Sequence, residues 1–294
     1  MHLKPRQTGS EGLYGASERR RIQVIRPIRS ASDDLVGGMR SLVQSAGMLR
    51  AMTVTRLKMR YRYSLLGWGW AVLQPVSLMV LYSVILQHLT SHGTESLPYP
   101  LFVFAGLTPW AFCSTAITTA AAGMLNYRPL MATVYFPREI VPISFVVASL
   151  IDFVIAVLVL LAMMAYYSIP ISITVLLIFP VVGVLVVLVI AICLLISSIQ
   201  VRIRDINVVL PLALQVLVFT APIVYPASAV PTAVQSLYWL NPFAILIHSF
   251  REAAVGGGVP AAGDLFYCAV VAVASFLIAY LVFKRIEPTI VDDM

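Results

Sequence analysis

The chain has 294 residues, of which 60% are hydrophobic and 11% are charged, and its formal net charge is +7. Soluble domains are about 45–50% apolar and about 25% charged, so the composition excludes an ordinary cytosolic enzyme, a disordered regulator and a nucleic-acid-binding domain. Its three cysteines lie singly in apolar stretches, which argues against a disulfide framework or a zinc site: Cys113, Cys193 and Cys268.

The N-terminal region divides into two parts. Residues 1–31 are rich in Gly, Ser and Arg and are predicted to form a flexible basic tail. Residues 32–66 are predicted to form an amphipathic helix on the cytoplasmic membrane surface, because Ser32 and two acids suit a helix start and apolar residues follow at spacings of three and four. The predicted interface residues are Arg56, Lys58, Arg60, Arg62, Trp68 and Trp70. A solvated basic linker is the alternative.

The remainder, residues 67–294, is predicted to be an all-α membrane domain. Six windows contain the roughly 20 mostly apolar residues that a membrane-spanning helix needs. They cover residues 69–90, 101–122, 140–167, 171–199, 206–225 and 265–283. The first begins too late in the chain for a cleavable signal peptide, so the N-terminus is expected to stay in the cytoplasm.

The distribution of basic residues orients these six predicted spans. Of the 20 Lys and Arg residues, all but Arg251 fall in segments that six crossings place on one side. Cytoplasmic loops carry the Lys and Arg excess, so both termini are predicted to be cytoplasmic. The positive charge therefore points to a membrane surface rather than to nucleic acid.

Two loops have a distinctive composition. The loop at 124–139 is short, basic and cytoplasmic in this topology. The external loop at 226–264 contains an apolar stretch at 239–250 that is too short to span. That stretch is predicted to re-enter the outer leaflet as helix, with a polar set of residues at its ends: Asn241, Pro242, Arg251 and Glu252.

Catalytic and nucleotide-binding patterns are absent from the sequence. It contains no GxxxxGK[ST], HExxH or GxSxG motif, so no cofactor is expected on this chain. Asp152 is the only acidic residue well inside a predicted span. It is either a functional site or a bundle-facing acid bonded to a Ser, Thr or Gln of a neighbouring helix. A single acid is weak support for a proton-coupled transporter.

Three aromatic residues lie deep in the first two predicted spans: Tyr82, Trp110 and Phe112. They serve either helix packing or a stacking surface for a substrate, and the sequence leaves both readings open.

Five short motifs, taken together, resemble those of polysaccharide-export ABC permeases. They are YSLLGWGWAVLQP at 63–75, YFPREIVP at 135–142, RDI at 204–206, APIVYP at 221–226, and LNPF at 240–243 with FR at 250–251. Their order and spacing hold from about residue 35 to the C-terminus.

The resemblance implies a non-enzymatic permease half of an exporter for lipid-linked O-antigen, capsule or teichoic acid in the bacterial cytoplasmic (inner) membrane. It implies a homodimer in contact with membrane lipids and with separate ATPase subunits, which would bind ATP and Mg²⁺. The implied ATPase contacts are Arg128, Pro129, Arg138, Glu139, Arg204 and Asp205. The implied substrate path contains Tyr82, Trp110, Phe112, Phe219 and Tyr225. A drug or small-lipid exporter, a membrane-bound enzyme of envelope assembly and a secondary transporter are the alternatives.

Overall fold

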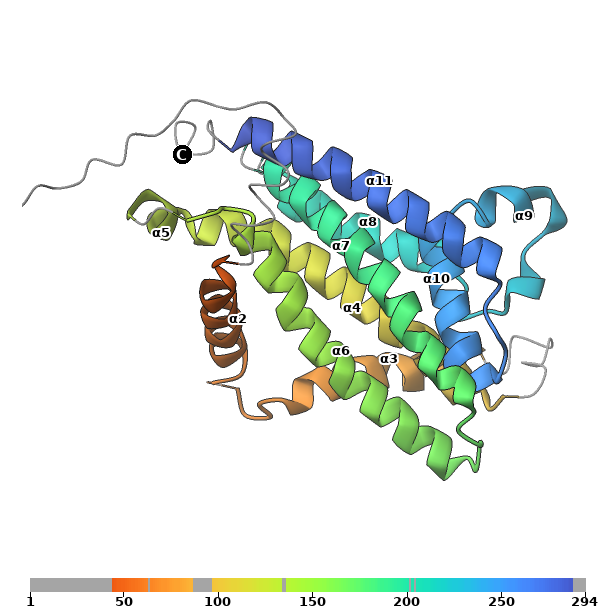
Figure 1. Cartoon of the computed structure of the whole chain (residues 1–294). Coiled ribbons are helices and arrows are strands. Elements are labelled where there is room, and N and C mark those ends of the chain that lie inside the picture. The colour runs from red at the N-terminus through yellow and green to blue at the C-terminus, as the bar shows by residue number, and fades with distance from the viewer. Residues whose placement is uncertain are drawn as a thin grey trace, which may run out of the picture.

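The computed structural model describes residues 44–62, 64–86, 97–133, 136–200, 202–203 and 205–287 (Figure 1). Throughout these residues the chain is helical and contains no strand, which confirms the predicted all-α class. The α-helices are α2 (Ala46–Tyr61), α3 (Gly69–Leu86), α4 (Tyr99–Asn126), α5 (Arg128–Thr133), α6 (Ile140–Tyr166), α7 (Ile178–Gln200), α8 (Ile206–Leu217), α9 (Thr232–Tyr238), α10 (Pro242–Arg251) and α11 (Ala262–Ile286). The predicted tail at 1–31 and the helix start predicted at Ser32 lie outside the described residues.

Four helical segments are long and apolar enough to cross a membrane: Tyr99–Met124, Ile140–Tyr166, Ile173–Gln200 and Ala262–Ile286. The first and fifth predicted spans correspond to shorter apolar helices, Gly69–Ile85 and Ile206–Thr220. The 12 residues of α8 extend only about 18 Å, against a hydrocarbon thickness of about 30 Å. Helix α8 ends early because a 3₁₀ turn follows, Ala221 is extended and Pro222 has no N–H to continue the helix.

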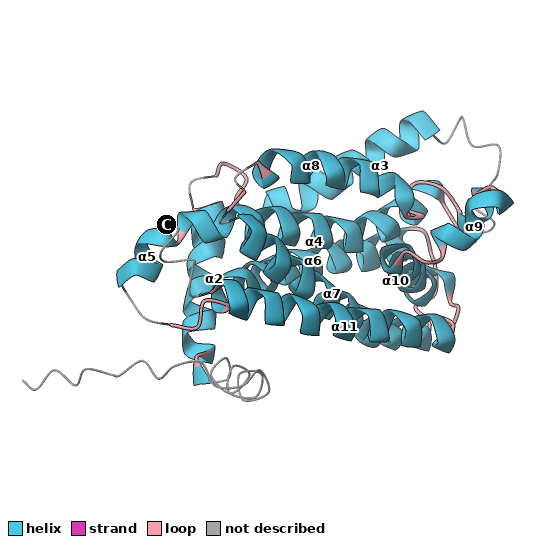
Figure 2. Ribbon diagram, turned by 90° about the horizontal axis from the view of Figure 1, so that it is seen from above, coloured by secondary structure: helices cyan, strands magenta, loops and turns pink. Residues whose placement is uncertain are grey.

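The helices form layers around α4. Figure 2 shows α3 and α8 on one side of α4, and α6, α7 and α11 on the other. In its most apolar window, α4 is 78% buried, whereas the other three long segments are 22–33% buried. Helix α4 therefore forms the centre of the bundle, and α6, α7 and α11 leave apolar residues exposed on their outer faces.

The two ends of the bundle differ in content. Helices α2 and α5 and the C-terminal end of α11 lie at one end, and α9 and α10 lie at the other (Figure 1). Helix α10 packs against α4, α7 and α11, and its apolar residues are buried, Leu246 and Phe250 completely. The apolar stretch of the predicted external loop is thus a helix inserted among the long helices.

Candidate functional site

A groove of about 540 Å³ runs between α3, α4 and α8. Helix α4 forms its floor with Leu107 and Trp110. Helix α3 contributes one wall with Tyr82, and α8 with the 3₁₀ turn that follows it contributes the other, which includes Phe219. Three of the five predicted path residues therefore meet in one groove, although they come from helices far apart in the sequence.

The groove also carries polar side chains that the sequence reasoning did not select. They are Gln74 of α3, Gln215 of α8, and Ser114, Thr115 and Thr118 of α4. The hydroxyl of Ser114 donates to the carbonyl of Ala111 (3.3 Å), and that of Thr118 donates to the carbonyl of Ser114 (2.7 Å). These bonds within the helix satisfy the hydroxyl protons, so an apolar helix tolerates the polar row. The Ser and Thr spacing in α4 was the available sequence signal.

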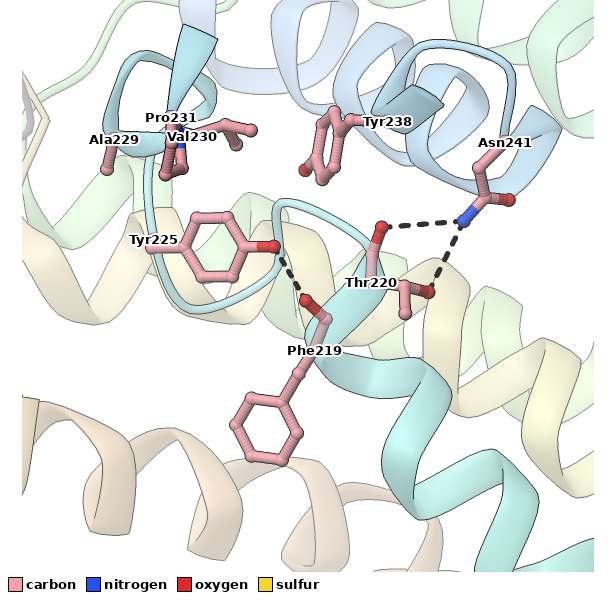
Figure 3. A pocket seen from close by; sticks show the side chains of 8 residues that line it. All are labelled: Phe219, Thr220, Tyr225, Ala229, Val230, Pro231, Tyr238 and Asn241. Atoms are coloured by element: carbon pink, nitrogen blue, oxygen red, sulfur yellow. Dashed lines mark hydrogen bonds between the residues drawn. The ribbon is translucent and has the colours of Figure 1, made fainter. Parts of the chain in front are cut away.

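A second cavity, of about 480 Å³, lies beside α9 (Figure 3). It shares Phe219 with the groove. The hydroxyl of Tyr225 donates to the carbonyl of Phe219 (2.6 Å), and the amide of Asn241 donates to the hydroxyl of Thr220 (3.3 Å). Tyr238 faces the same space (Figure 3). Tyr225 thus extends the set of aromatic residues to the α9 end.

Phe112, the remaining predicted path residue, does not line the groove. Its side chain is only 2% exposed, and its ring packs on that of Phe153 of α6 at 5.7 Å between centroids. Trp110 and Phe112 are two residues apart on a helix, about 200° around its axis, so they point to opposite sides. The structure therefore places Phe112 in the packing between α4 and α6.

Asp152 binds the N-terminal helix, not the Ser, Thr or Gln that the sequence analysis considered. Its carboxylate accepts hydrogen bonds from Arg60 Nη1 (2.8 Å) and from the hydroxyl of Tyr61 (2.7 Å). Asp152 and Arg60 also line a small cavity that shares Gln74 and Thr115 with the groove. The intramembrane acid thus fixes the end of α2 beside α6.

The predicted interface residues of α2 fall on two faces. Lys58 and Arg62 are exposed, as are Trp68 and Trp70 in the following segment. Arg56 is not at the surface, contrary to the expectation. It is 8% exposed and lies over the rings of Phe145, at 3.0 Å, and Tyr127, at 4.5 Å. Burial lowers the pKa of Arg56 to about 10, so it stays charged at neutral pH.

Arg56 and Arg60 are four residues apart on α2 and therefore share one helical face. That face packs against α6, which explains why Arg56 is buried and why Arg60, although 41% exposed, reaches Asp152. The sequence showed the periodicity but not which basic residues would be turned inward.

The predicted ATPase-contact residues fall into two groups in the structure. Arg128 and Pro129 begin α5, and exposed Asp205 precedes α8, while Arg204 lies outside the described residues. Arg138 and Glu139, in contrast, bind the end of α11 within the chain. Arg138 donates to the carbonyl of Glu287, and fully buried Glu139 pairs with Lys284 at 3.0 Å.

Burial raises the pKa of Glu139, while Lys284 opposes the rise. In this conformation Arg138 and Glu139 join α6 to α11, with Glu139 buried and Arg138 half-buried. Their contact with an ATPase stays a prediction.

The predicted loop residues surround α10. Asn241 caps the helix by accepting a hydrogen bond from the backbone N–H of Phe243 (3.0 Å), and Pro242 occupies the first turn. At the other end, Glu252 pairs with His248 at 3.3 Å. Arg251 is 5% exposed and donates to the carbonyls of Pro222 and Ile223. It anchors α10 to the bend after α8.

The bundle, with four membrane-length helices among the described residues and a groove beside the central one, has the features of a multi-pass membrane protein. Among the described residues, no group of three or more His, Cys, Asp or Glu side chains is placed to hold a metal ion.

Comparison with known proteins identifies the family. Residues 48–255 match the model of the ABC-2 type transporter family, so the chain belongs to that family and is an integral membrane protein. It is 31% identical over 251 residues to the O-antigen export system permease protein RfbA of Myxococcus xanthus, covering 84% of this chain and 95% of the relative. This match confirms the resemblance drawn from the five motifs.

Two further relatives are more distant. A protein of Klebsiella pneumoniae with the same RfbA name is 24% identical, covering 71% of this chain and 81% of the relative. The polysialic acid transport protein KpsM of Escherichia coli is 22% identical, covering 81% and 93%. All three are named as permease or transport proteins and none as an enzyme, in agreement with the expectation of a non-enzymatic chain.

Proposed function

We propose that this chain is the permease half of an ATP-driven exporter that moves a lipid-linked polysaccharide across the bacterial cytoplasmic membrane. Two copies face each other, and two separate ATPase subunits bind ATP and Mg²⁺ on the cytoplasmic side. The groove between α3, α4 and α8 carries the proposal, since it is open and is lined by both aromatic and hydrogen-bonding side chains. Similarity to O-antigen and polysialic acid transport proteins supports the substrate class.

The lining suits a sliding glycan. The C–H faces of sugars stack on aromatic rings such as Tyr82, Trp110 and Phe219, while their hydroxyls bond to amides and hydroxyls such as Gln74 and Gln215. Because the groove of one copy is open, a closed passage needs a second copy, and a twofold dimer is the usual arrangement. Each copy then supplies half of the wall.

The proposed topology has six crossings, with α3 and α8 as the two short ones. A short helix is tolerated there because the passage beside it is wet, and water satisfies the backbone groups beyond its ends. The basic residues put both termini in the cytoplasm. In this arrangement α2 lies at the cytoplasmic interface with exposed Lys58, Arg62, Trp68 and Trp70 against the lipids, and α9 and α10 re-enter from outside.

The proposed contact with the ATPase is α5, with Arg128 and Pro129, together with Arg204 and Asp205 before α8. Arg138 and Glu139 support this contact from within the bundle. Their bonds to Glu287 and Lys284 join the start of α6 to the end of α11. A movement of α5 would therefore be transmitted to α6 and α11 together.

The function is tested by co-expressing the chain with its ATPase and measuring co-purification and ATP hydrolysis with a lipid-linked glycan. We expect glycan to stimulate hydrolysis. Stimulation by hydrophobic drugs alone would support the drug-exporter alternative instead.

Trp110→Leu and Phe219→Leu test the groove. We expect several-fold slower export with unchanged assembly, because a stacking platform is worth at most about 1–3 kcal/mol, by analogy with base stacking. Phe112→Leu is the matched control. It should reduce thermal stability and leave export by the inserted protein intact. Equal export by all three variants would contradict the proposed path.

A further inference from the structure

The groove and the cavity that adjoins it contain no charged side chain among the described residues that line them. Their polar groups are amides and hydroxyls, including Gln74 and Gln215 in the groove and Thr220 and Asn241 farther along. Phe219 lines both spaces, so the two uncharged linings adjoin at this residue. The chain has 20 basic and 13 acidic residues, so a lining without charge is a specific feature of this region.

Charged residues close to this surface are already paired. Asp152 and Arg60 line the small cavity that adjoins the groove at Gln74 and Thr115, but they bind each other at 2.8 Å. Near the outer cavity, the guanidinium of Arg251 is buried against the carbonyls of Pro222 and Ile223 and over the ring of Phe102, at 3.7 Å. Neither cation is directed at a ligand in the groove.

Two hydroxyls of the floor act as hydrogen-bond acceptors. Ser114 and Thr118 use their hydroxyl protons within α4, so toward the groove these two side chains offer only lone pairs. Sugar hydroxyls supply the matching donors. A carboxylate or phosphate group has only acceptors and would meet acceptors at these two positions, and the donors of the groove, such as the amides of Gln74 and Gln215, carry no charge.

Passages for anions are lined by Arg or Lys, because an ionised group at membrane depth needs a partner. A twofold copy would bring the same lining, which holds no cation among the residues that the structure describes. We propose that the exported polymer is an uncharged glycan, and that glycans with a carboxylate or phosphate in every repeat are poor substrates. This inference rests on the proposed function. It separates the chain from KpsM, which is named for polysialic acid, an acidic polymer.

The test uses the full-length chain with its ATPase in two bacterial hosts that lack their own glycan permease. One host makes a lipid-linked neutral mannose polymer, and the other makes lipid-linked polysialic acid. Surface glycan is measured per permease molecule in the membrane. We expect export of the neutral polymer to exceed export of polysialic acid by about tenfold, which corresponds to about 1.4 kcal/mol.

Opposite charges at one groove position separate the permease from any preference of the ATPase. Gln215 is exposed on the α8 wall. Gln215→Lys should raise the ratio of polysialic acid to neutral export several-fold, and Gln215→Glu, of nearly the same size, should lower it. Gln74→Lys and Gln74→Glu repeat the comparison on the α3 wall if a Gln215 variant fails to assemble.

The outcomes are distinct. Equal export of both polymers, or charge variants that leave the ratio unchanged or shift it in the same direction, would overturn the inference and leave the proposed function standing. Export of neither polymer by the assembled wild-type complex would overturn the proposed function itself.

Discussion

The two ends of α4 make the same kind of contact with a neighbouring helix, but the two contacts differ in strength. At each end a buried arginine from another helix lies over an aromatic ring, and a glycine of α4 provides the space. Toward α10, Arg251 lies over Phe102 beside Gly106. Toward α2, Arg56 lies over Phe145, whose ring occupies the space at Gly123.

The difference lies in what each guanidinium bonds. Arg251 donates to two backbone carbonyls, whose positions are fixed by the bend after α8. Within the described residues, the guanidinium of Arg56 makes no hydrogen bond of regular geometry and is held by ring faces. Directional bonds to backbone resist displacement more than ring contacts do. The α10 end is therefore the fixed end of the bundle, and the contact of α2 is the one more easily separated.

Replacing Arg251 should have the largest effect. Arg251→Leu leaves the carbonyls of Pro222 and Ile223 buried without their donor, which we expect to destabilise the protein by about 3 kcal/mol. Thermal unfolding in detergent measures the loss. Arg251→Lys keeps the charge with a single donor group and should fall between Leu and wild type. Wild-type stability in the Leu variant would mean that this contact does not fix the end.

Gly106→Ala should follow, at about 2 kcal/mol. Its Cβ would collide with the guanidinium of Arg251. It would also meet the backbone of Ile223 at 3.0–3.1 Å, and backbone atoms cannot move aside cheaply. Gly183→Ala in α7 is the matched control, because nothing lies within 4 Å of its Cβ. The control should be neutral or more stable by up to about 1 kcal/mol, since Ala favours helix. A similar loss in both variants would argue against crowding at Gly106.

Sequence reasoning anticipated the features that depend on local pattern. The apolar windows located the long helices, and the apolar stretch in the external loop corresponds to the buried helix α10. Five motifs in register identified the family. The resemblance also named Tyr82, Trp110 and Phe219, which the structure brings into one groove.

Features that depend on which face a helix turns inward were not predictable in this way. Composition assigns Arg56 to the membrane surface, and only the packing of α2 on α6 shows it buried. Phe112 and Trp110 look equivalent in sequence, yet they point to opposite sides of α4. Arg138 and Glu139 look like a docking surface because their partners on α11 are about 145 residues away. Gln74 and Gln215 can be recognised as groove residues only once the structure shows that α3 and α8 both pack beside α4.

Gly123→Ala tests the weaker end. Its Cβ would collide with the far edge of the Phe145 ring, which can rotate away, so we expect a loss of only about 1 kcal/mol. Rotation of that ring would remove the surface under Arg56. Hydrogen exchange of α2 should therefore increase while that of α10 stays unchanged. Faster exchange in α10 as well would mean that the two ends are coupled rather than independent.

The Arg60–Asp152 pair should show the smallest effect and measures how firmly α2 is attached beyond Arg56. Arg60 is 41% exposed and Asp152 14% exposed, so solvent screens the pair and a coupling of about 0.5–1 kcal/mol is expected. A double-mutant cycle of Arg60→Leu and Asp152→Asn isolates this coupling from the loss of either side chain. Tyr61→Phe removes the other donor to Asp152 and is its matched control. Because Asp152 lies near the middle of α6, a coupling well above this range would place the pair in a drier environment than its exposure indicates. The α2 contact would then be comparable in strength to the Arg251 contact, and the contrast between the two ends would no longer hold.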